Sequence, residues 1–144
     1  MTRFAGGPSQ SPGFLMWHAT MSWQRTMTAT LAPLGLTHVQ FVLLACAWWL
    51  ASTDEPPTQV RLAAQAGTDV KMTSDVVARL EGKGLVRRAA HPTDARAKVV
   101  TVTDEGAALA RRAIEEVEAA DAEFFAAVDT PALVTVLATL AASG

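Results

Sequence analysis

Apolar residues recur at helical spacing from Phe14 onward. Two apolar faces run through the first such segment, one carrying Met16, Trp23, Met27, Leu31 and Leu34 and the other Phe14, Trp17 and Met21. Spacings of three, four and seven residues place each set on one side of a helix. Pro33 and Gly35 end this helix. Because it has two apolar faces, we expect it to be covered on two sides.

The next apolar segment predicts a central core helix. Thr37 and Gln40 are spaced as a capping box, in which each side chain satisfies a backbone amide of the first helical turn. From there to about Ser52 the chain is nearly apolar on every face. A membrane-spanning helix needs about 20 apolar residues. The apolar run over residues 39–51 is shorter than that, so we interpret it as a buried helix of a folded domain.

Two shorter helical segments follow with a glycine between them. Thr58 is a good N-cap for a helix that reaches Ala66, and Gly67 then supplies a tight turn. Asp69 begins another helix that ends near residues 82–84. Two short helices joined by a three- or four-residue turn containing glycine are typical of a helix-turn-helix.

The polar and apolar pattern changes to that of a hairpin after this point. Residues 85–88 precede a turn-rich stretch at 91–97, and residues 98–103 are rich in valine and threonine, which favour strands. A hairpin that directly follows a helix-turn-helix is a wing. The sequence therefore predicts a two-stranded wing.

Helical spacing returns in the C-terminal part. Thr103 caps a helix whose first turn is acidic, which suits the helix dipole. An apolar seam along this helix, suited to a partner helix, comprises Ala113, Val117, Ala120, Phe124 and Val128. Thr130 and Pro131 then match the N-cap and first position of a last helix, which carries Leu133, Val136, Leu137 and Leu140. Glycine, proline and serine cluster in residues 1–12 without an apolar period, so this segment reads as a flexible arm.

The charge of the chain is divided between two regions of opposite sign. The formal net charge of its 144 residues is only −2, which by itself argues against a general nucleic-acid coat. Residues 61–98, however, contain eight basic and four acidic residues, a net +4. Residues 103–129 contain eight acidic and two basic residues, a net −6. A basic lobe beside an acidic helix is what a DNA-binding protein needs, although a chance cluster on a solvated surface gives the same pattern.

Several other classes of protein are disfavoured. Cys46 is the single cysteine, so no intramolecular disulfide and no multi-cysteine zinc site is expected. Its apolar surroundings predict an inert, buried thiol. Nucleotide-binding glycine motifs are absent and the three histidines are widely separated, so the sequence predicts neither an enzyme nor a cofactor or metal site. The N-terminus does not resemble a signal peptide, and a cytoplasmic protein is expected.

Two stretches of the lobe resemble the MarR (multiple antibiotic resistance regulator) family of bacterial transcription factors. One is LAAQAGTDVKMTSDVVARLEGKGLVRR at Leu62–Arg88, and the other is HPTDARAKVVTVTDEG at His91–Gly106. The second is the more specific, because Asp-x-Arg at a wing tip followed by a strand and Thr-x-x-Gly is a hallmark of the family. The order of flanking helices is also similar over roughly residues 13–142.

The resemblance implies a mainly α fold, a winged helix-turn-helix with a two-stranded wing and long N- and C-terminal dimerisation helices. Residues 13–144 would be one domain, with the winged lobe at about 37–103 and the dimerisation helices at about 13–34 and 104–142. It implies a homodimer that binds a palindromic operator on double-stranded DNA, usually to repress transcription. Release by a small aromatic or anionic ligand is frequent in the family, and no enzyme activity or membrane association is implied.

The lobe offers candidate DNA contacts on the wing and on the second helix of the helix-turn-helix, the recognition helix, which begins at Asp69. Lys71, Met72, Thr73 and Ser74 lie at the helix end that enters the major groove, although Thr73 is alternatively buried against the preceding helix. Arg96 is the strongest candidate, because a guanidinium at a wing tip fits a narrow minor groove. Asp94 would hold Arg96 or cap the turn, and Asp75 would accept from a cytosine amine or pair with Arg79. Candidate phosphate contacts are Arg79, Arg88 and Lys98.

The two long N-terminal helices offer a candidate ligand pocket. Its residues are Trp17, His18, Met21, His38 and Phe41. An aromatic wall with imidazoles suits a flat, anionic molecule. The alternative interpretation is that these side chains are ordinary core or interface residues. For the whole protein, the alternative function is a winged-helix dimerisation module that binds protein and never DNA.

Overall fold

The structure is a computed structural model and describes residues 2–143. Within that range the elements are α1 (Pro12–Leu31), α2 (His38–Thr53), α3 (Gln59–Ala66), α4 (Val70–Gly82), β1 (Val86–Ala90), β2 (Lys98–Val102), α5 (Asp104–Phe124) and α6 (Thr130–Ala142). Two short 3-10 turns, η1 (Pro8–Gln10) and η2 (Ala32–Leu34), precede and follow α1. This order confirms the mainly α winged helix-turn-helix predicted from the sequence.

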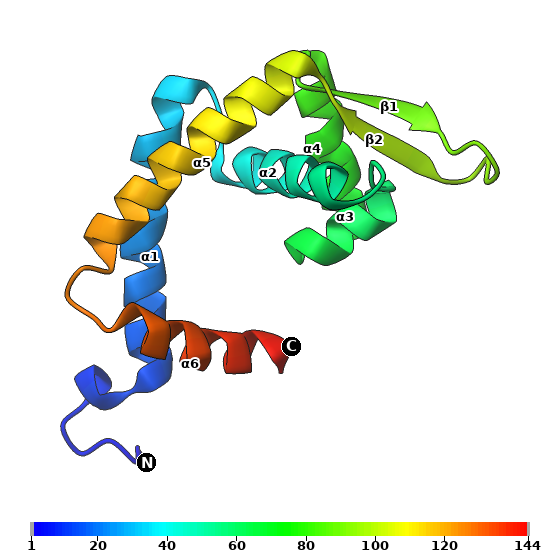
Figure 1. Cartoon of the computed structure of the whole chain (residues 1–144). Coiled ribbons are helices and arrows are strands. Elements are labelled where there is room, and N and C mark those ends of the chain that lie inside the picture. The colour runs from blue at the N-terminus through cyan, green and yellow to red at the C-terminus, as the bar shows by residue number, and fades with distance from the viewer. Residues whose placement is uncertain (1, 144) are drawn as a thin grey trace.

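Helix α2 is the centre of the molecule, as its apolar pattern predicts. It packs against α1, α3, α4, α5 and β2, and Figure 1 shows it crossing between α5 and the pair α3 and α4. The buried core around it comprises Met27, Leu31, Leu43, Leu44, Leu50, Leu62, Val77, Leu80, Val86 and Val100. The helix-turn-helix and the two long helices therefore share one core.

Side-chain caps begin the helices where the sequence places them. Thr37 and Gln40 form the predicted capping box, with each side chain accepting from the other residue's backbone amide at 3.2 Å. Thr58 caps α3 and Asp69 caps α4. Each such cap is worth about 1 kcal/mol to its helix. The N-cap of α6 was predicted one residue too late, at Thr130. The side chain that accepts from the Ala132 amide is that of Asp129.

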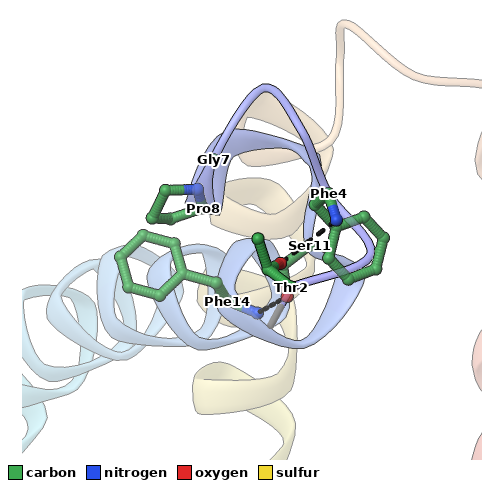
Figure 2. A pocket seen from close by; sticks show the side chains of 6 residues that line it. All are labelled: Thr2, Phe4, Gly7, Pro8, Ser11 and Phe14. Carbon is green, nitrogen blue, oxygen red and sulfur yellow. Dashed lines mark hydrogen bonds between the residues drawn. The ribbon is translucent and has the colours of Figure 1, made fainter.

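The segment before α1 contains local turns. Residues 1–12 were predicted to be a flexible arm. In the structure the Gly7 amide donates to the Phe4 carbonyl at 2.9 Å and the Gly6 amide to Gln10 Oε1 at 2.8 Å. Figure 2 shows Phe4 and Phe14 at a hollow of about 510 Å³, which Thr2, Gly7, Pro8 and Ser11 also line. Helix α1 accordingly begins at Pro12, with Ser11 as its cap.

The wing is an antiparallel hairpin that projects away from the helices (Figure 1). Val86 pairs with Val102 and Ala90 with Lys98 at its two ends. The middle of β2 is fixed to the loop before α3, because the Val100 amide donates to the Pro57 carbonyl at 2.8 Å. This bond and an isolated bridge between Thr58 and Val99 tie the wing to the helix-turn-helix.

The seam predicted along α5 for a partner helix is partly used within the chain itself. Ala113 and Val117 are buried, and α5 packs against α1 and α2. Val128 lies beyond the end of α5 and is exposed. Helix α6 contains no buried residue, and in Figure 1 it follows the loop after α5 and lies apart from the winged lobe.

The Thr-x-x-Gly motif joins the start of α5 to the segment directly after α4, the recognition helix. Thr103 Oγ1 donates to the Gly84 carbonyl at 2.7 Å and accepts from the Gly106 amide at 3.0 Å. A Cβ on Gly106 would lie 2.0 Å from the Leu85 carbonyl oxygen. Only glycine therefore allows α5 to start this close to the backbone that follows α4.

Candidate nucleic-acid interface

The turn between α3 and α4 is built by local backbone and hydroxyl contacts. Gly67 adopts a left-handed conformation, with φ of 72°, which costs glycine little. Asp69 Oδ1 accepts from the Met72 amide at 2.7 Å and so begins α4. Thr68 and Thr73 share a hydroxyl hydrogen bond of 2.7 Å across the turn. These contacts fix the angle at which α4 leaves α3.

The first turn of α4 presents fewer side chains than the sequence predicted. Lys71 and Met72 are exposed and Ser74 is half-buried. Thr73 is 0% exposed, and its hydroxyl also donates to the Asp69 carbonyl. The structure contradicts a DNA contact by Thr73 and confirms the alternative that it is buried against the preceding helix. Helical periodicity had already placed Thr73 on the face that carries Val76 and Val77.

At the wing tip the structure distinguishes between two predicted roles of Asp94. Its Oδ1 accepts from the Arg96 backbone amide at 3.1 Å, so Asp94 caps the turn. Asp94, Arg96 and Lys98 are all exposed. Because no described carboxylate lies within ion-pair distance of the Arg96 guanidinium, its charge is available at the most protruding part of the lobe.

Arg88 lies in a polar network at the base of the wing. Its backbone amide donates to Glu81 Oε2 at 2.9 Å, its Nε to Glu81 Oε1 at 3.3 Å and its Nη1 to Gln59 Oε1 at 3.3 Å. These bonds, led by the one from the Arg88 backbone amide, hold the pKa of Glu81 below its usual value. The side chain of Arg88 is only 26% exposed. These bonds join α4, β1 and α3, and the phosphate contact that the sequence predicts for Arg88 stays a prediction.

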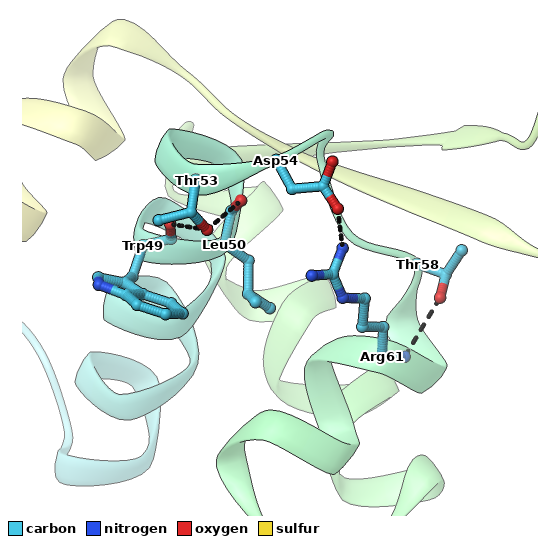
Figure 3. A network of polar contacts seen from close by, with 6 residues as sticks. All are labelled: Trp49, Leu50, Thr53, Asp54, Thr58 and Arg61. Carbon is cyan, nitrogen blue, oxygen red and sulfur yellow. Dashed lines mark hydrogen bonds and ion pairs between the residues drawn. The ribbon is translucent and has the colours of Figure 1, made fainter.

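Arg61 is also paired within the protein. Figure 3 shows its guanidinium pointing from α3 toward the Asp54 carboxylate at the end of α2, with Nη1 3.2 Å from Oδ2.

The alternative that Asp75 pairs with Arg79 is not found, since the ion pairs among residues 2–143 are Arg61–Asp54 and Arg88–Glu81.

Between residues 61 and 98, the basic side chains that are exposed and have no hydrogen-bond or ion-pair partner among the described residues form a smaller set than the sequence count. We call them the open cations, and they are Lys71, Arg79, Arg87, Arg96 and Lys98. Arg61 and Lys83 are also exposed, but Arg61 pairs with Asp54 and Lys83 donates to Gly35 and Gln40. Sequence reasoning did not assign a DNA contact to Arg87. Neighbouring residues on a strand point to opposite faces, so Arg87 faces outward when Arg88 bonds to Glu81. The alternation of side chains along β1 was the sequence signal that could have identified Arg87 as an exposed cation.

The five candidate ligand residues do not form one enclosed pocket within a single chain. On the first half of α1, Trp17 is 60% exposed, His18 and Met21 are also exposed, and His18 contacts Phe14 edge-on at 4.5 Å. On α2, His38 contacts Trp23 edge-on at 5.0 Å and its Nδ1 lies 3.5 Å from Gln24 Oε1. Phe41 is partly buried against the core.

A half-buried cluster lies where α1, α2 and α5 meet. Trp23 Nε1 donates to Asp121 Oδ1 at 2.8 Å, and His38 packs on the Trp23 ring. Burial lowers the pKa of His38 and outweighs the opposing effect of the Asp121 charge. Burial therefore favours the neutral imidazole of His38 in this cluster.

Cys46 lies within α2, partly buried against the core. Burial raises the pKa of its thiol. A protonated thiol is a poor nucleophile, in agreement with the inert thiol expected from the sequence.

Among residues 2–143, no single helix has the length and apolar composition to cross a membrane, although the bent pair 12–34 and 38–53 meets those criteria when its two parts are taken together.

The sequence profile of the MarR family matches residues 36–98. The HTH-type transcriptional regulator YdcH of Bacillus subtilis is 44% identical over 121 residues, which cover 84% of this chain and 82% of YdcH. The chain belongs to the MarR family. Another member, the HTH-type transcriptional repressor Rv2887 of Mycobacterium tuberculosis, is 33% identical over 119 residues, or 83% of each chain.

Solved structures of similar proteins share the fold. CouR from Rhodococcus jostii, bound to p-coumaroyl-CoA, has a TM-score of 0.79 at 27% identity and covers 93% of this chain and 91% of its own. A mutant MarR from E. coli complexed with operator DNA has a TM-score of 0.76 at 26% identity and 91% coverage of both chains. Rv2887 with salicylic acid has a TM-score of 0.64 at 30% identity, covering 93% of this chain and 96% of its own. YdcH and Rv2887 are named as transcription regulators.

Proposed function

We propose that this MarR-family regulator is a homodimeric repressor that binds a palindromic operator with two winged lobes. The observation that carries the proposal is the placement of the open cations. Lys71 lies on the first turn of α4 and Arg96 at the wing tip, the two parts of a winged lobe that enter the grooves of DNA. The operator complex of the E. coli MarR mutant and the repressor name of Rv2887 support it.

Exposed apolar side chains on α1 and α6 support the dimer. On α6 they are Val134, Val136, Leu137 and Leu140, and on α1 they are Phe14, Leu15, Met16 and Trp17. Monomeric proteins rarely expose apolar surface on this scale. A second copy that covers these faces by two-fold symmetry presents two lobes, for which we expect half-sites about one helical turn, or ~10 bp, apart.

We further propose that a small aromatic or anionic molecule releases the DNA. The candidate residues Trp17, His18, Met21, His38 and Phe41 lie on two helices, and exposed α1 residues among them require a second chain to enclose a pocket. CouR bound to p-coumaroyl-CoA and Rv2887 with salicylic acid support an effector of this chemistry. Release of a labelled operator by a panel of aromatic carboxylates, followed by fluorescence anisotropy, tests this part of the proposal.

Operator binding is expected to weaken steeply as salt concentration rises. The five open cations per chain give a dimer up to ten phosphate contacts, and each contact contributes about −0.9 to the slope of log K against log salt. Between 50 and 200 mM salt the affinity should fall by roughly 10³- to 10⁵-fold. Fragments of genomic DNA selected by the purified protein supply the operator for anisotropy titrations. Failure to select any fragment, or a flat salt response, would favour the protein-binding module instead.

Arg96→Ala is expected to lower operator affinity by about 10- to 100-fold while leaving the fold intact. The guanidinium at the wing tip has no carboxylate partner among the described residues, so its removal costs DNA binding and little else. Arg111→Ala is the matched control, because Arg111 is an exposed arginine on the acidic helix α5. Equal affinities of the two variants would contradict a role of the wing in binding.

A further inference from the structure

The C-terminal end of the recognition helix is joined to the corner between α1 and α2. Lys83 directly follows α4, and its Nζ donates to the Gly35 carbonyl at 2.5 Å and to Gln40 Oε1 at 2.8 Å. Gly35 closes η2 after α1, and Gln40 lies in the first turn of α2. One ammonium therefore connects the end of α4 to the point where α1 ends and α2 begins.

The acceptor on α2 is itself held in place. Gln40 is only 6% exposed, and its Oε1 also accepts from the Thr37 amide at 3.2 Å as part of the capping box. A buried carbonyl oxygen with two donors has little freedom to move. Lys83 is thus fastened to a rigid acceptor rather than to a mobile surface side chain.

A second connection reaches the same segment from α5. Thr103 Oγ1 donates to the Gly84 carbonyl at 2.7 Å, and the Thr103 amide donates to the Leu85 carbonyl at 3.0 Å. The residues directly after α4 are therefore bonded on one side to the α1–α2 corner and on the other to the start of α5. In Figure 1 the ends of α1 and α4 lie at the same end of the molecule as the start of α5.

The position of the α4 C-terminus decides where its N-terminus points. The helix has 13 residues, or a length of about 20 Å, so a tilt of about 10° at one end moves the other by about 3 Å. A hydrogen bond to a base tolerates only a few tenths of an ångström. A small change in the position of the α4 C-terminus at Lys83 is thus enough to displace Lys71 and Met72 from a base edge.

We propose that Lys83 is a positioning residue for DNA recognition, which sets the angle of α4 from the α1–α2 corner and makes no contact with DNA. The inference rests on the proposed function. Two carbonyl oxygens occupy the Lys83 ammonium, and it lies at the opposite end of α4 from the turn that carries Lys71. Lys83 is one of the eight basic residues counted in residues 61–98, but it is not one of the open cations.

The test compares Lys83→Met with Lys71→Met by salt-dependent operator titration. Methionine keeps most of the aliphatic stem and removes the ammonium. Lys83→Met is expected to lower affinity on the order of tenfold, with the slope of log K against log salt unchanged. Lys71→Met removes an exposed cation from each chain of a dimer, so its slope should become shallower by about 1.8.

Partner variants separate positioning from simple loss of stability. Gln40→Met removes one of the two acceptors of Lys83 and should reproduce part of the affinity loss of Lys83→Met. The double variant should bind no more weakly than Lys83→Met alone, because Lys83→Met already removes the contact to Gln40. Gln40→Glu keeps an acceptor for both donors and should retain affinity within about twofold. Thermal unfolding of each variant reports on stability separately.

Two results would overturn the inference even though the wild-type protein binds DNA. A shallower salt slope for Lys83→Met, like that of Lys71→Met, would make Lys83 a phosphate contact. An unchanged affinity with a lowered melting temperature would make it a stabilising residue only. A wild-type protein that binds no DNA would overturn the proposed function together with this inference.

Discussion

The double substitution Val136→Asp, Leu140→Asp is expected to leave the protein monomeric at micromolar concentration and to abolish tight operator binding. Both side chains are exposed on α6, and Leu140 is 54% exposed in the isolated chain. In a two-fold dimer each change occurs twice, so four aliphatic side chains are lost from the interface. Burial of each is worth about 1.5–3 kcal/mol, so dimerisation should weaken by at least about 10⁴-fold.

The loss of the dimer has a second consequence for DNA binding. A dimer holds two half-sites at once, and the second contact profits from a high effective concentration. A monomer should therefore bind the operator at least about 100-fold more weakly. Sedimentation velocity measures the oligomeric state and anisotropy measures the affinity.

Ala108→Asp is the control for the oligomeric state. It introduces the same carboxylate at an exposed position of α5, near the helix N-terminus where negative charge is tolerated. This variant should remain a dimer. Circular dichroism shows that the α6 variant is still folded. A wild-type protein that sediments as a monomer, or an α6 double variant that stays dimeric, would contradict the proposed architecture.

Gly106→Ala is expected to be the most destabilising single-methyl change in the winged lobe. The added Cβ would lie 2.0 Å from the Leu85 carbonyl oxygen and 3.0 Å from Val102 Cγ1. The nearest atom belongs to backbone that also accepts from the Thr103 amide, so it cannot rotate away as a side chain would. Overpacking of this kind costs about 3 kcal/mol or more, which lowers the melting temperature by about 10 °C.

Gly82→Ala provides the matched control for this substitution. Gly82 is the last residue of α4, and a Cβ there would meet nothing within 4 Å. Alanine restricts the unfolded chain more than glycine does, so this variant should be as stable as the wild type or up to about 1 kcal/mol more stable. If thermal unfolding gives the same melting temperature for both variants, the close approach at Gly106 does not constrain the fold.

Several features of the fold were predictable because they depend on neighbours in sequence. Thr37 and Gln40 form a capping box from residues three positions apart, and Asp69 caps α4 in the same way. The wing required only a turn-rich segment between two short strands. Such local signals need no knowledge of the rest of the chain.

Predictions about single side chains were less successful where packing decides exposure. Thr73 has the chemistry to bond a base edge, yet the angle between α3 and α4 buries it. For Arg88 the phosphate contact stays a prediction, while β1 turns its guanidinium toward Glu81. The seam on α5 was read as a surface for a partner helix, and much of it packs on α1 and α2 of its own chain.

The sequence by itself determined the kind of protein this is. Helical periods, caps, a glycine turn and a hairpin define a winged helix-turn-helix, and charge counting along the chain places a basic lobe beside an acidic helix. Only the tertiary structure decided which cations of that lobe are exposed without a partner in the chain. Lys83 and Arg88 bond to groups that folding brings close. Lys83 bonds to Gly35 and Gln40, which lie 48 and 43 residues away in the sequence. Arg88 bonds to Gln59, which lies 29 residues away. The net charge of a segment is a sum over its residues. Whether each charged group is free to contact a ligand depends on the partners that packing places beside it.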